Sequence, residues 1–109
     1  MQATNLKQYS NGTVLTNDHT VIVFQVKQLV WRNEALIAFI ELFFALTPAA
    51  KRVETIEGAD RLSVHFHYLH YDFLLNIEWY SESIWIEAYS DQAHQPIDKL
   101  YQHISQLTS

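Results

Sequence analysis

The sequence predicts an α+β domain, a two-layer sandwich in which two helices cover one face of an antiparallel meander sheet. Four stretches between residues 50 and 89 alternate apolar and polar side chains, which is the pattern of half-buried strands. A mostly apolar segment over residues 34–46, interrupted by Glu41, has the length of a helix, and a one-sided apolar stripe follows in residues 96–107. With a first strand before the apolar segment, the expected order is β-α-β-β-β-β-α.

The length and composition are those of one globular domain. The chain has 109 residues, of which 49% are hydrophobic and 17% are charged, and it contains no cysteine. This composition excludes an intrinsically disordered chain, and the lack of cysteine excludes disulfides and thiol chemistry. We therefore expect a single domain over residues 1–109, with the polar residues 1–12 loose.

The charge balance and the hydropathy pattern bear on the partners. Seven Lys and Arg against twelve Asp and Glu give a net charge of −5, whereas a protein that binds nucleic acid needs a basic surface. The N-terminus lacks the apolar segment of a signal peptide, and the most apolar run, residues 35–46, is shorter than the roughly 20 residues that span a bilayer. We expect a cytoplasmic protein with no nucleic-acid or membrane partner.

The N-terminal half contains the first strand and the first helix. Residues 20–27 are β-branched and apolar on both sides, which predicts a covered strand, and residues 14–15 are a candidate short strand before it. Asn33 is the expected N-cap of the helix, which ends at Thr47-Pro48 because a proline restricts the residue before it. Apolar side chains surround most of residues 34–46, so we expect this helix to be buried on more than one side.

Two features of the remaining elements follow from local signals. Pro96 is a favourable first residue for the last helix, and the stripe of that helix contains Ile97, Leu100, Ile104 and Leu107. The first strand could pair beside residues 50–57 or beside residues 83–89, and the sequence leaves this open.

Alternation within the four strands predicts their register. A turn at residues 69–70 sets Phe66 opposite Phe73, and a turn at 81–82 sets Ile77 opposite Ile86. A turn at 58–59 sets Val53 opposite Val64 and places Arg52 on the open face in one row with His65, Leu74 and Tyr89. Apolar side chains then meet throughout one face, which both helices cover.

The opposite, open face carries an unusual mixture. Arg61 beside Glu78 and His67 beside Asp72 are the cross-strand pairs expected of a solvated face. Several large apolar side chains share this face, and such a patch indicates a contact surface. The predicted interaction patch consists of Trp85, Tyr89, Leu74, Ile56, Arg61, Glu78 and Glu87.

Two motifs resemble a small bacterial family that is catalogued as a domain of unknown function. They are Gly58-Ala59-Asp60-Arg61 and Tyr80-Ser81-Glu82-Ser83-Ile84-Trp85-Ile86-Glu87. The resemblance extends over most of the chain in the layout strand, helix, four strands, helix. It implies the same fold and brings no activity with it.

The best chemical constellation is His65, His67 and Asp72, with His70 nearby. Side chains at i and i+2 of a strand project side by side, so two imidazoles could share a divalent metal with the carboxylate as third ligand. The alternative interpretation is a set of half-exposed polar residues on the wet face of a sheet.

Three further candidates are weaker. Glu78 and Glu87, expected one row apart, could form an acid–base pair, but Arg61 would neutralise Glu78 and an open sheet offers no cleft. Asp60 and Arg61 could form a recognition site at their turn, or simply bond the turn and pair across the sheet. Trp85 and Tyr89 could stack on RNA bases, which the acidic surroundings disfavour.

The sequence thus favours a non-enzymatic protein-interaction module without a cofactor. It would bind a second copy or another protein through the open sheet face around Trp85, Tyr89 and Leu74, or through the apolar helix over residues 34–46. The alternative is a metal-dependent binding or hydrolytic protein that uses His65, His67 and Asp72. A third option is a small apolar ligand between the helix and the sheet.

Overall fold

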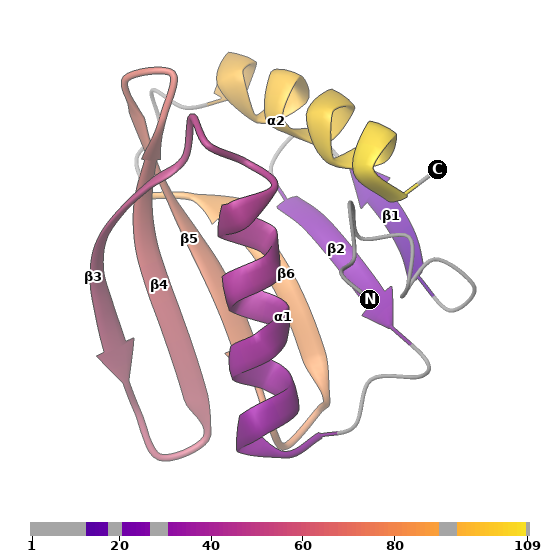
Figure 1. The fold of residues 1–109 in the computed structure, drawn as a ribbon, viewed down its shortest axis with the longest axis vertical. Coiled ribbons are helices and arrows are strands. Elements are labelled where there is room, and N and C mark those ends of the chain that lie inside the picture. The colour runs from indigo at the N-terminus through magenta and orange to yellow at the C-terminus, as the bar shows by residue number, and fades with distance from the viewer. Residues whose placement is uncertain (1–12, 18–20, 27–30, 90–93, 109) are drawn as a thin grey trace.

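A computed structural model describes residues 13–17, 21–26, 31–89 and 94–108, which form an antiparallel sheet of six strands and two helices (Figure 1). The expected loose segment, residues 1–12, lies outside the described residues. The elements in chain order are β1 (Thr13–Asn17), β2 (Val21–Val26), α1 (Asn33–Ala45), β3 (Lys51–Glu57), β4 (Arg61–Tyr68), β5 (Tyr71–Glu78), β6 (Ser83–Ala88) and α2 (His94–Thr108).

The predicted α+β class is confirmed, and the strand order is β1-β2-β6-β5-β4-β3. Strands β3 to β6 form the expected meander. The candidate short strand is real, since β1 pairs with β2 at one edge of the sheet. Strand β2 lies antiparallel to β6, which answers the question of where the first strand pairs.

Both helices cover the same face of the sheet (Figure 1). Helix α1 contributes four buried residues to the core, and aromatic rings interlock at its centre, where Phe24 of β2 meets Phe39 and Phe43 edge to face. The imidazole of His103 in α2 is hydrogen-bonded to the carbonyl oxygen of Leu46 at the end of α1, over 3.2 Å. The strand residues buried on this face are Ile22, Phe24, Val64, Phe66, Tyr68, Phe73, Leu75, Ile77, Ile84 and Ile86.

The register of β4 against β5 is as predicted, with Phe66 opposite Phe73. The register of β5 against β6 keeps the predicted parity but differs by two residues, because Ile77 pairs with Ile84 instead of Ile86. The turn starts earlier than expected: the N–H of Glu82 donates to the carbonyl of Trp79, and Glu82 adopts a left-handed φ of 52°. Glycine is the residue that usually indicates a left-handed turn position, and residues 79–83 contain none, so the sequence did not reveal where this turn starts.

The predicted register of β3 is wrong. Val64 pairs with Thr55 instead of Val53, and a bulge lies between Arg52 and Glu54. The extra residue reverses the parity before the bulge, so Arg52 lies opposite Phe66 on the helix face. Its guanidinium there pairs with Glu41 of α1 over 2.9 Å, and it does not join the open-face row.

Helix α1 differs from expectation in two ways. Arg32 is the N-cap residue in place of Asn33, and no side chain caps the helix. The helix is not buried all round, because an exposed stripe that includes Ile37 and Glu41 runs along it, with Ile37 53% exposed. The buried stripe consists of Leu36, Phe39, Ile40 and Phe43.

Helix α2 starts at His94, two residues before the expected Pro96. A proline is tolerated in the first turn because its missing N–H would have no partner within the helix there. Ile97, Leu100 and Ile104 are buried as predicted, and the side chain of Leu107 lies outside what the structure describes. In the described part of the chain, neither helix has the length and apolarity needed to traverse a lipid bilayer.

Candidate functional site

The open face of the sheet places most of the predicted interaction patch together. Trp85 of β6 lies opposite Asn76 of β5, and its indole N–H donates to Glu87 Oε2 over 2.9 Å. The guanidinium carbon of Arg61 lies 5.0 Å from the centroid of the indole ring, a cation–π arrangement. The indole is half-buried under these contacts, and Ile84, the residue before it, is buried against the helices.

Arg61 and Glu78 are cross-strand neighbours as predicted, but the expected ion pair between them is not among the contacts of the described residues. Arg61 stacks on Trp85 instead, and Glu78 accepts a hydrogen bond from Ser81. Glu87 lies opposite Leu74 and not in the row next to Glu78, because of the two-residue difference in register. Each carboxylate therefore has its own partner, and the two do not form an acid–base pair.

The rest of the patch is more accessible to solvent. Tyr89 is 52% exposed, and Ile56 of β3 is 44% exposed. Leu74 of β5 is half-buried and lies between His65 of β4 and Glu87 of β6. The backbone N–H of Tyr89 donates to the carbonyl of Asp72, which fixes the tyrosine beside Asp72, whereas the sequence placed it beside Leu74.

Ser63 and Asn76 form a buried polar pair on the open face, where the sequence predicted solvent-exposed residues. Asn76 is fully buried, and its Oδ1 accepts a hydrogen bond of 2.7 Å from the hydroxyl of Ser63. Its Nδ2 has no partner among the described residues. A buried amide donor without an acceptor is costly, so this pair lowers the stability that the face would otherwise contribute.

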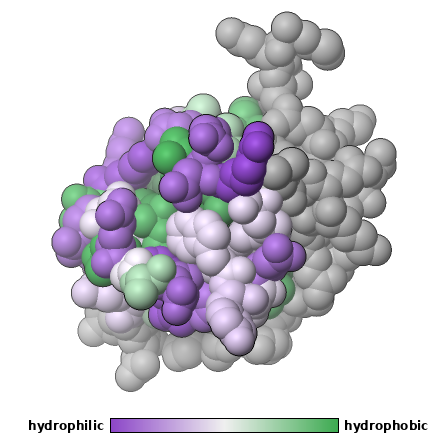
Figure 2. Space-filling view, turned by 90° about the horizontal axis from the view of Figure 1, so that it is seen from below, coloured by the Kyte–Doolittle hydropathy of each residue, from purple (hydrophilic) through white to green (hydrophobic). Residues whose placement is uncertain are grey.

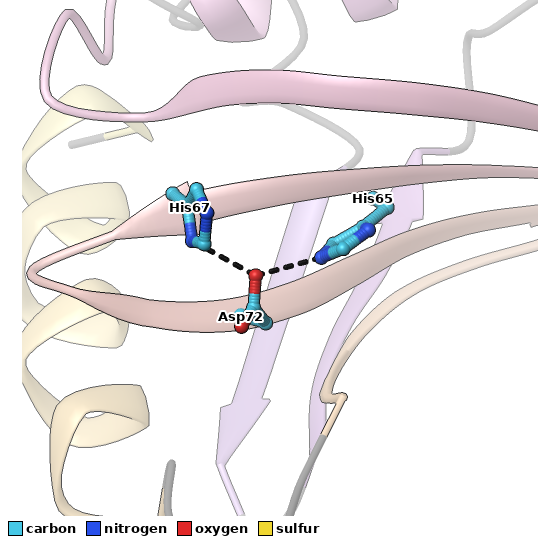
Figure 3. A network of polar contacts seen from close by, with 3 residues as sticks. All are labelled: His65, His67 and Asp72. Carbon is cyan, nitrogen blue, oxygen red and sulfur yellow. Dashed lines mark hydrogen bonds and ion pairs between the residues drawn. The ribbon is translucent and has the colours of Figure 1, made fainter.

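His65, His67 and Asp72 do converge (Figure 3). Both imidazoles contact the same carboxylate oxygen: His65 Nε2 lies 2.7 Å and His67 Nδ1 lies 2.8 Å from Asp72 Oδ1. A carboxylate only accepts, so the Nε2–H of His65 donates the hydrogen bond, and His67 forms an ion pair with the same oxygen when it is protonated. The ring of His65 also packs on the ring of Tyr89, with centroids 4.5 Å apart.

This geometry is that of a hydrogen-bonded network, because a metal would need the lone pairs of both imidazoles at one point. Within residues 13–17, 21–26, 31–89 and 94–108, no three histidine or acidic side chains are arranged to hold a metal ion. Nδ1 of His65 is buried and has no partner in the described part of the chain, whereas half of the His67 side chain is exposed. His70 lies in the β4–β5 turn and lines a surface pocket together with His67.

A cleft at the other end of the sheet includes the turn of Asp60 and Arg61, which the sequence offered as a weaker candidate recognition site, but the part that α1 contributes was not predicted. It lies where the N-terminal end of α1 meets the β3–β4 turn and the end of β5, and its volume is ≈ 540 Å³. The turn that starts at Gly58 is closed by a hydrogen bond from the N–H of Gly58 to the carbonyl of Arg61. The N–H of Trp79 donates to the carbonyl of Asp60, which holds β5 against the turn. The Gly58–Arg61 motif was the available signal, but the cleft depends on how α1 packs.

Comparisons with known proteins agree with the resemblance of the two motifs. No curated protein and no solved structure matches the chain. The model of one protein family matches residues 13–108, which covers every strand and both helices. The chain therefore belongs to the family described as "Protein of unknown function (DUF3630)".

Proposed function

We propose that this domain is a non-enzymatic protein-interaction module whose open sheet face binds a second copy of the chain. One observation carries the proposal: aromatic and aliphatic side chains lie on the face that neither helix covers, with Tyr89 and Ile56 about half exposed. Single exposed apolar residues are ordinary on a protein surface, whereas several large apolar side chains on one open face are typical of a contact surface.

The charges around the patch support a second copy as the partner. Lys51 and Arg61 lie at opposite ends of β3 and β4, and Glu54 and Glu87 lie beside the apolar centre. A two-fold axis through the centre would bring basic residues of one copy toward acidic residues of the other. A self-complementary surface of this kind is what a symmetric dimer requires. The same acidic residues disfavour nucleic acid on this face.

The size of the face indicates how strong the dimer should be. Neighbouring strands are about 4.8 Å apart and rise about 3.3 Å per residue, so the five strands β2, β6, β5, β4 and β3 present an open face of roughly 500 Å². Stable interfaces bury about 800 Å² on each partner. We therefore expect a dimer that dissociates in the micromolar range and that changes with protein concentration.

Sedimentation velocity between about 5 and 500 µM tests this proposal across the expected dissociation range. The wild type should shift from monomer to dimer, and Tyr89→Glu, which puts a charge on the patch, should stay monomeric. Tyr80→Glu is the matched control, because Tyr80 is 90% exposed in the β5–β6 turn outside the patch.

Circular dichroism would verify that both variants keep the fold. A wild type that stays monomeric at the highest concentration would refute the proposal. Equal dimerisation of the wild type and both variants would place the dimer contact elsewhere and would refute the role of the sheet face.

A further inference from the structure

The cleft at the N-terminal end of α1 has the composition of a binding site for a small molecule. Its apolar lining comes from Leu36 of α1, Leu62 of β4 and the half-buried indole of Trp79. Its polar lining includes Glu57 and Asp60 of the β3–β4 turn. Small-molecule sites typically combine an apolar wall with a few placed polar groups in this manner.

The view from below shows this end of the molecule (Figure 2). A hydrophobic area lies in the middle, and hydrophilic residues surround it. The cleft volume of ≈ 540 Å³ is within the range of ligand sites. Such a shape suits a ligand with an apolar body and a polar or charged end.

The charges at the cleft favour a cation. Glu57 and Asp60 are exposed, and within the described residues neither carboxylate takes part in an ion pair. Arg61 also borders the cleft, but its guanidinium is held over the ring of Trp85. The positive end of the α1 dipole is offset by Glu34 in the first turn of the helix. Among the charged residues that line the cleft, two carboxylates thus stand against one guanidinium that is engaged elsewhere.

We propose that this cleft binds a small organic cation, with its charged nitrogen near the carboxylates of Glu57 and Asp60 and its apolar part against Trp79 and Leu62. The tryptophan ring offers a large apolar surface to the apolar part of the ligand, and the two carboxylates add a direct charge interaction with its nitrogen. This site is separate from the sheet face and does not depend on dimerisation.

Benzyltrimethylammonium is a suitable probe, because its charge is permanent and its ring is the size of a typical apolar fragment. A ligand of this size is expected to bind with a dissociation constant on the order of 1 mM. Titration followed by ¹⁵N–¹H NMR should give saturable shifts at the N-terminal end of α1, the β3–β4 turn and the indole N–H of Trp79. Benzoate, which has a similar ring and the opposite charge, should cause none of these shifts.

Matched variants test the two parts of the site. Asp60→Asn and Glu57→Gln should each weaken binding by about 2–5-fold, and Trp79→Leu by about 5-fold. Glu54→Gln is the control, since Glu54 lies on the same strand and does not line the cleft. If Trp79→Leu fails to fold, the two carboxylate variants still decide the outcome.

Several results would overturn the inference. They are the absence of saturable shifts at ten times the expected constant, equal shifts with benzoate, and a loss with Glu54→Gln as large as with Asp60→Asn. Saturable shifts confined to residues outside the cleft would also refute it.

Discussion

The turn between β4 and β5 should be a source of strain that two substitutions remove. Leu69 and His70 occupy its two central positions with φ angles of 54° and 70°. Two positive φ values define a type I′ turn, for which Asn-Gly is the favoured pair. For residues with a Cβ, the left-handed region costs roughly 1–2 kcal/mol each. The hairpin therefore forms although its turn conformation is unfavourable for the two residues that occupy it.

The expected gain can be worked from these two positions. Glycine at position 70 relieves one such cost, but its greater freedom in the unfolded chain takes back about 0.5–1 kcal/mol. Asparagine at position 69 tolerates the left-handed region, and the loss of leucine contacts is small because Leu69 is 40% exposed. We expect the double variant Leu69→Asn, His70→Gly to be about 1 kcal/mol more stable, or about 4–8 °C higher in Tm.

Urea unfolding and thermal melts followed by circular dichroism would measure the change. Ala59→Gly is the control, because Ala59 is exposed in another turn and its φ is not positive. It should lower the stability, as glycine does at an ordinary position. A double variant that is no more stable than the wild type would show that the strain argument is wrong.

The remaining predictions concern packing, polar burial and pH. Phe73→Ala should cost about 3–5 kcal/mol in urea unfolding, because the ring is fully buried against Phe66 and Tyr68; a loss below about 1 kcal/mol would contradict the assigned core face. Ser63→Ala should cost about 1–3 kcal/mol, because the buried side-chain amide of Asn76 loses its hydrogen bond from the Ser63 hydroxyl. An unchanged urea midpoint would show that water replaces the hydroxyl. Burial raises the pKa of Tyr68 above the ordinary value of 10.0. The unfolded chain therefore loses the proton first, and stability present below pH 10 falls as the pH rises further. Tyr68→Phe should lose less stability between pH 9 and pH 11 than the wild type, and identical losses would contradict this assignment. Glu82→Gly should raise the melting temperature, because Glu82 also has a positive φ.

The parity of side chains was predictable from the sequence for β4, β5 and β6. Apolar residues alternate there without interruption, and a one-residue slip would expose the whole core face. The absolute register was less predictable. Glu82 adopts a left-handed conformation that a glutamate does not indicate. The pairing of β5 with β6 therefore differs from the predicted register by two residues.

The bulge in β3 had no sequence signal at all. Val53 reads as an inward residue of an alternating strand, yet it is the extra residue of the bulge and is half exposed. What decides the outcome is tertiary: Arg52 gains Glu41 and the ring of Phe44 on the helix side. Contacts between a strand and a helix cannot be read from the periodicity within either element.

The candidate sites divide in the same way. The pair of His67 and Asp72 followed from the register, because the two residues lie directly opposite each other. The contact of His65 with the same oxygen is diagonal across the strands and depends on side-chain rotamers. The cleft depends on the position of α1 above two turns, which no pattern within either turn reveals.

The bulge in strand β3 also bears on whether the protein aggregates at high concentration. All seven of its residues are exposed, and it forms one outer edge of the sheet. An edge of this kind invites other chains to add strands, which is how aggregates and fibrils begin. The irregular backbone at Val53 and the charged Lys51 and Glu57 interrupt that process. Deletion of Val53 would straighten the edge and should turn a chain rich in aromatic and branched residues toward fibril formation.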